Sequence, residues 1–185
     1  MEAATYAPQP GDIGLTKVAG VVGWDIRLGQ WLNGDGFSQF EHAFVVIESD
    51  SHGWTKSIVE AMPGGARHTA RVYAPEDTVY LRCPDRLRPA MTAAALRYVG
   101  VPYSFLDYLA LAYHRIHFPI PGLRRYISDT RHMICSQLAD QAAADAGWHI
   151  FTDGRWPGYV TPGALDHVYG EQLYAAARTA LGDPS

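Results

Sequence analysis

Cys135 is the residue in this sequence whose surroundings most favour chemistry. It lies in MICSQLADQAAADAG, residues 133–147, where a short apolar stretch leads into an alanine-rich segment that predicts a helix. A helix N-terminus favours the thiolate, which is the nucleophilic form of cysteine. The alternative is that the thiol only packs, because cysteine is among the most buried residue types. Its position therefore makes Cys135 a candidate nucleophile and leaves both roles open.

A nucleophilic thiol needs a base, and His42 is the best candidate among the eight histidines. Most of the others fall in predicted loops, whereas His42 opens EHAFVVIESD, residues 41–50, the clearest strand of the sequence. Alternation along that strand places His42, Phe44 and Val46 on one face. A histidine in line with apolar residues could also be a core residue whose nitrogens are hydrogen-bonded.

Glu60 is the candidate for the group that orients the histidine. It lies in KSIVEAM, residues 56–62, which predicts the return strand of a hairpin turning near 50–53. An unpaired carboxylate in such an apolar segment would be costly to bury. Cross-strand neighbours are roughly 5 Å apart at Cβ, so the carboxylate could accept from the His42 ring. The alternative is an edge-strand Glu60 that faces water. Cys83, in LRCPD, has no helix start beside it and is predicted to pack.

The elements that must position these residues form an α+β pattern, because strands and helices are grouped along the chain and do not alternate as βαβ units. We expect a single domain over residues 1–185. The predicted helices cover residues 18–32, 88–100, 101–116 and 135–147, with a helical turn over 161–168; the predicted strands cover 41–50, 56–62, 71–75 and 77–84; turns or loops cover 63–68 and 117–132.

Bulk composition narrows the class of function. The chain has 185 residues and a net charge of -4, which gives no electrostatic reason to expect nucleic acid or an anionic membrane as a partner. No apolar run approaches the ~18 residues of a membrane span, and no signal peptide is evident, so cytoplasmic residence is the expectation. Two cysteines cannot form a disulfide scaffold. Metal-binding and phosphate-loop motifs are absent, so we expect no metal and no organic cofactor.

Six segments, in this order, resemble the circularly permuted branch of the NlpC/P60 papain-like superfamily, the YiiX/YaeF-like group. The segments are PGDIG, EHAFVVI, IVEAMPGGARH, VGVPYSFLDYLAL, ICSQLADQAAADAG and VTPGAL, and the resemblance covers residues 10 to 166. The histidine precedes the cysteine here, as in that permuted group. The resemblance implies a papain-like α+β fold in which a mainly antiparallel sheet packs against the cysteine-bearing helix. It also implies that Cys135 is the nucleophile, His42 the base and Glu60 the orienting residue.

The resemblance further implies a cysteine peptidase or amidase that cleaves an amide bond through a covalent acyl-enzyme. Peptides, peptidoglycan-derived compounds and small N-acyl compounds are the expected substrates, and the scissile bond itself is not identified. Tyr103 and Asp107 match a stretch that lines the substrate side in the family, although core packing and a helix-start carboxylate explain them equally well. Two alternatives stay open: an acyltransferase that uses the same thioester, and a non-catalytic binding module.

Overall fold

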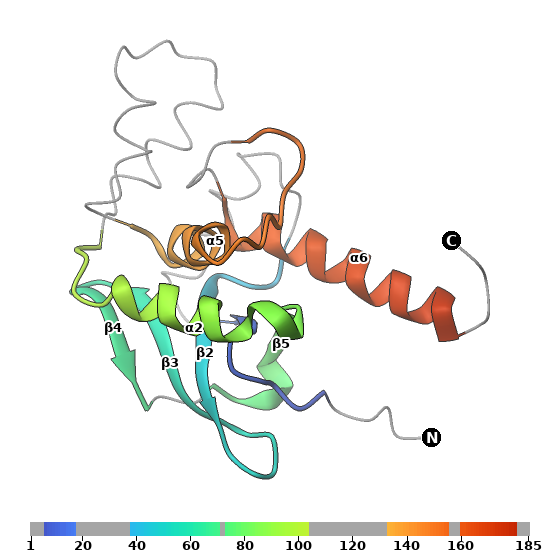
Figure 1. Cartoon of the computed structure of the whole chain (residues 1–185), viewed down its shortest axis with the longest axis horizontal. Coiled ribbons are helices and arrows are strands. Elements are labelled where there is room, and N and C mark those ends of the chain that lie inside the picture. Colours follow the sequence, from blue (N-terminus) through green and yellow to red (C-terminus); the bar gives the residue numbers. More distant parts are fainter. Residues whose placement is uncertain (1–5, 18–37, 71–72, 104–132, 156–159, 181–185) are drawn as a thin grey trace.

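The computed structural model describes residues 6–17, 38–70, 73–103, 133–155 and 160–180, and within these ranges the fold is α+β (Figure 1). Five strands form one antiparallel sheet in the order β4-β3-β2-β1-β5. The strands are β1 Ile13–Thr16, β2 His42–Ser49, β3 Thr55–Met62, β4 Gly65–Thr69 and β5 Thr78–Leu81; the α-helices are α2 Arg88–Arg97, α5 Cys135–Asp145 and α6 Pro162–Ala180; short 3-10 helices cover Pro75–Asp77 and Asp85–Leu87.

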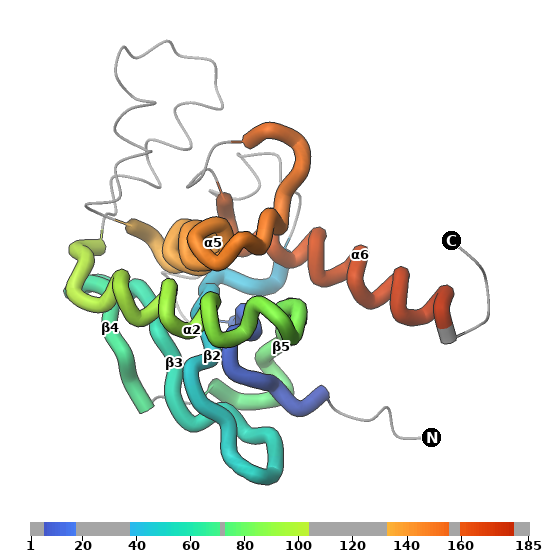
Figure 2. Tube along the Cα trace, viewed as in Figure 1, coloured from blue at the N-terminus to red at the C-terminus, as the bar shows by residue number. Residues whose placement is uncertain are grey.

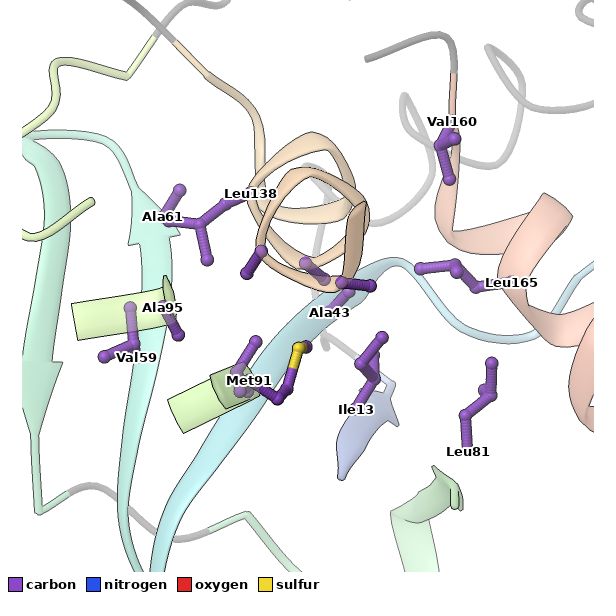
Figure 3. Packing of buried hydrophobic residues seen from close by; sticks show 14 of the residues in the cluster. Ile13, Ala43, Val59, Ala61, Leu81, Met91, Ala95, Leu138, Val160 and Leu165 are labelled. Atoms are coloured by element: carbon purple, nitrogen blue, oxygen red, sulfur yellow. The ribbon is translucent and has the colours of Figure 1, made fainter. Parts of the chain in front are cut away.

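The central strand β2 has two apolar faces, as its predicted alternation requires. Ala43 and Val45 face the main core, which α2 and α5 cover from one side (Figures 2 and 3). Phe44 and Val46 belong to a smaller cluster with Ile58 on the other side of the sheet. Because successive side chains of a strand point to opposite faces, this smaller cluster shares its face with His42.

Helix α5 begins at Cys135, as predicted, and packs its small residues against the sheet. Leu138 is fully buried beside Ala61 of β3, as Figure 3 shows. The Gln137 side chain accepts from the backbone N–H of Ile134 at 2.9 Å, which fixes the start of the helix. The helix ends before Gly147, whose φ of +79° is the left-handed conformation that suits glycine at this position.

The strands 41–50, 56–62 and 77–84 and the helix 88–100 are confirmed within a few residues at their ends. The predicted turn over 63–68 is wrong in its extent. The turn takes only Pro63 and Gly64, because Met62 already pairs with Gly65 to open β4. Gly64 and Gly65 have φ of +108° and +113°, which permits this tight reversal.

The predicted strand over 71–75 is also wrong in its described part, because Tyr73 and Ala74 have no strand pairing and a 3-10 helix starts at Pro75. The short β1 was not predicted, since it follows a Pro-Gly turn and has only four residues. The helical turn predicted over 161–168 extends to Ala180.

The predicted helix 18–32 lies outside the described residues. The helix predicted over 101–116 does not begin at Val101, because residues 101–103 are not helical, and the rest lies outside the described residues.

Candidate active site

His42 and Cys135 meet because each is the first residue of its element. His42 opens β2 and Cys135 opens α5, and both side chains are almost fully buried. The thiol and the imidazole share a hydrogen bond. The other ring partner is Glu60, whose Oε2 lies 2.9 Å from His42 Nε2. Since Nε2 is engaged by the carboxylate, Nδ1 is the nitrogen that can face the thiol.

Glu60 lies on β3, diagonal to His42, with Phe44 as its direct cross-strand partner. The carboxylate is fully buried and both of its oxygens accept hydrogen bonds. Oε2 accepts from His42 Nε2 and from the Tyr73 hydroxyl at 2.6 Å. Oε1 accepts from Arg67 Nε at 3.0 Å and from Nη2 at 2.7 Å. Glu60 therefore faces the protein and not water.

These hydrogen bonds keep the Glu60 carboxylate ionised. Burial alone would raise its pKa, but the donors His42, Tyr73 and Arg67 lower the pKa to about 2. A permanently charged carboxylate on Nε2 holds the proton on that nitrogen and fixes the orientation of the ring.

The His42 imidazole is flanked by anionic partners on both sides. Burial acts to lower its pKa, but the charge and hydrogen bond of Cys135, followed by those of Glu60, raise the pKa to about 9. The interaction is reciprocal, so an imidazolium beside the sulfur stabilises the thiolate. Together with the position of Cys135 at a helix N-terminus, this favours a thiolate–imidazolium pair near neutral pH.

Two residues of this site, Tyr73 and Arg67, were not predicted from the sequence. Arg67 lies on β4 directly opposite Glu60, so a cross-strand charge pair could have been predicted had β4 been recognised. Tyr73 lies between strands and carries no comparable sequence signal. Its ring contacts the His42 ring at 5.6 Å between centroids and stacks on Phe44 at 5.1 Å.

The backbone at the start of α5 adds hydrogen-bond donors beside the thiol. The first N–H groups of a helix have no acceptor within the helix, and Cys135 and Ser136 hold the first two positions of α5. The Ser136 hydroxyl donates to the Val160 carbonyl at 2.7 Å, which ties the helix start to the segment before α6. Such donors can stabilise an oxyanion that forms near the sulfur.

The remaining predicted residues take different places. Tyr103 is partly buried against the main core and its backbone forms a bridge with Met133, two residues before Cys135. Asp107 lies outside the described residues. Cys83 is a packing residue, as predicted: it is buried in the main core, and burial raises the pKa of its thiol to about 11.

Within the described ranges, no helix has the length and apolar character that crossing a bilayer requires. The same residues contain no group of three or more His, Cys, Asp or Glu side chains arranged to hold a metal ion. Comparisons with models of protein families, with curated proteins and with solved structures gave no match to this chain.

Proposed function

We propose that this protein is a thiol hydrolase that cleaves an amide or peptide bond through Cys135, His42 and Glu60. One observation carries the proposal: a single buried imidazole lies between a thiol at a helix N-terminus and a fully hydrogen-bonded carboxylate. A nucleophile, a base and an orienting group in this order constitute a catalytic triad for acyl transfer. The sequence resemblance to permuted NlpC/P60 enzymes supports the same assignment.

In the first half of the reaction, the Cys135 thiolate attacks the carbonyl carbon and forms a C–S bond. Backbone N–H groups at the start of α5 stabilise the oxyanion. His42 then donates its Nδ1 proton to the departing amine, the C–N bond breaks, and an acyl-enzyme remains. Glu60 holds the Nε2 proton throughout and stabilises the imidazolium that precedes this transfer.

In the second half, neutral His42 takes a proton from water, and the resulting hydroxide attacks the thioester. The C–S bond breaks, the carboxylic acid leaves, and the thiolate is restored beside the imidazolium. The substrates proposed are peptides, peptidoglycan-derived peptides or small N-acyl compounds, since each presents an amide carbonyl.

Alkylation of the two cysteines by iodoacetamide across pH tests the proposal, with each thiol quantified by peptide mass spectrometry. Cys83 is an internal control in the same sample, because burial raises its pKa. We expect Cys135 to react already at pH 6, well below the pKa of about 8.5 of an ordinary thiol. A Cys135 rate that rises only near that value, or no reaction at any pH, would contradict the proposal and favour a binding module.

A further inference from the structure

A cleft of about 780 Å³ opens on the face of the sheet opposite α5. Its walls come from the N-terminal segment, the β2–β3 turn, β5 and α6. Aromatic and aliphatic side chains dominate the lining, and they include Tyr6, Trp54, Tyr73, Tyr80 and Leu173. This volume falls within the roughly 300–1,000 Å³ of small-molecule sites in proteins.

Two tyrosines of the cleft use their hydroxyl groups within the protein, which leaves their rings as the binding surface. The Tyr73 hydroxyl donates to Glu60 at 2.6 Å, and the Tyr80 hydroxyl lies 3.3 Å from Thr55 Oγ1. The Tyr80 ring also contacts Tyr6 at 6.4 Å between centroids. These contacts fix the rings before a ligand arrives, so little ordering cost is left for binding.

Arg82 gives the cleft its charge. Among the described residues that line the cleft it is the only Lys, Arg, Asp or Glu, and it is exposed. The guanidinium carbon lies over the Tyr6 ring, 4.1 Å from its centroid, which is a cation–π contact. A guanidinium presents several N–H donors whose geometry suits a carboxylate. The backbone N–H of Arg82 donates to the Gln172 side chain at 3.1 Å, which anchors the residue to α6.

We propose that this cleft binds an organic anion with a flat aromatic body, its carboxylate paired with Arg82 and its rings packed among the tyrosines and Trp54. The site is distinct from the position of the acyl-enzyme, because neither Cys135 nor His42 lines the cleft. Tyr73 belongs to both places: its ring forms part of the cleft wall and its hydroxyl contacts Glu60.

Calorimetric titration of the full chain tests this site, with 2-naphthoate as the anionic probe. The neutral 2-naphthamide and the cationic 2-naphthylmethylammonium have the same ring system and differ in charge. All titrations use the Cys135→Ala background, so that an amide is not turned over and binding is measured independently of the proposed hydrolysis. We expect one naphthoate per chain, bound at least tenfold more tightly than either of the other two probes.

Two pairs of variants locate the bound anion. Arg82→Gln is expected to weaken naphthoate binding about tenfold and to leave naphthamide binding within twofold, whereas Arg86→Gln, outside the cleft, changes neither. Leu173→Asp is expected to abolish naphthoate binding, whereas Leu96→Asp on α2 does not; the two leucines are similarly exposed, at 49% and 41%. Equal affinity for all three probes, no binding, or equal losses in the control variants would overturn the proposal.

Discussion

Arg67 lies directly across the β3–β4 pair from Glu60 and holds one of its carboxylate oxygens with two N–H groups, at 3.0 and 2.7 Å. The other oxygen is left to His42 and Tyr73. The arginine side chain is half exposed, whereas the carboxylate is fully buried. One surface residue therefore compensates a buried charge without occupying the oxygen that orients the imidazole.

Replacing Arg67 by glutamine should lower the stability of the protein at neutral pH and make that stability depend less on acid. In the wild type, the pKa of Glu60 is lowered to about 2, so its contribution to stability is complete above the ordinary value of 4.5 and is lost as pH falls through 2. Without Arg67 the folded-state pKa rises, and the contribution at neutral pH shrinks. We expect a loss of about 1 kcal/mol at pH 7, after allowance for the exposure of the arginine.

Urea unfolding between pH 3 and pH 7 measures this effect, with the exposed Arg86→Gln as the matched control. The depressed pKa is the source of the stabilisation. The difference in stability between Arg67→Gln and the wild type should therefore narrow toward pH 3, because Glu60 in the folded variant begins to take up a proton there and Glu60 in the folded wild type does so less. A constant difference across this range would mean that Arg67 acts only through packing.

Tyr73→Phe should reduce turnover without changing substrate affinity. The variant keeps the ring that stacks on Phe44 and contacts His42, but it removes the hydroxyl that donates to Glu60 at 2.6 Å. The carboxylate then holds the imidazole less rigidly, and we expect kcat to fall about fivefold, equivalent to about 1 kcal/mol, with KM unchanged.

Tyr80→Phe is the control for that variant, because its hydroxyl contacts Thr55 and not the triad. Steady-state kinetics on an amide that the wild type cleaves distinguish the two tyrosines. Equal effects of the two substitutions would show that Tyr73 contributes only through general packing.

The sequence was sufficient to predict the relation between His42 and Glu60, because it depends on local rules. Strand alternation set the face of His42, and a short hairpin brought Glu60 within two residues of it. The start of α5 at Cys135 followed from helix composition in the same way. Each of these inferences needed only neighbours in the sequence or a single turn.

Contacts between distant segments could not be predicted in this way. β1 has four residues and pairs with both β2 and β5, so its existence depends on two long-range partners. β4 was mistaken for a turn because its first residues, Gly65 and Ala66, have low strand propensity, and pairing with β3 overrides that preference. Tyr73 reaches Glu60 from an irregular segment, where no periodicity indicates the direction of a side chain.

The pH dependence of the reaction should report His42. With its pKa raised to about 9 by Cys135 and Glu60, the imidazolium that protonates the leaving amine is lost as pH rises through 9. We expect kcat/KM to fall above that pH. The raised pKa of His42 also stabilises the folded state. This stabilisation is complete below the ordinary histidine pKa of 6.5 and is lost as the pH rises through 9.

Glu60→Gln tests whether His42 causes this fall of kcat/KM at high pH, which forms the alkaline limb of the pH profile. The variant keeps an acceptor for Nε2 but removes the negative charge, so the limb should move to lower pH and kcat/KM should fall at least tenfold. Titration of the His42 ring protons by NMR follows the same group without turnover. A limb that stays in place while activity falls would assign the limb to another residue.

Substitution of Cys135 is the most direct test of the proposed chemistry. Cys135→Ala removes the nucleophile and should lower turnover by at least about 10³-fold, because the remaining groups supply only binding and oxyanion stabilisation. Cys83→Ala is the matched control: that thiol is equally buried but contacts the Pro84 carbonyl and no residue of the triad. It should keep turnover within about threefold while lowering stability by about 1 kcal/mol through lost packing.

Mass spectrometry of the wild type with a slowly hydrolysed acyl substrate should show the acyl group on the Cys135 peptide alone. Full turnover by Cys135→Ala, or an acyl group on Cys83, would exclude the proposed mechanism.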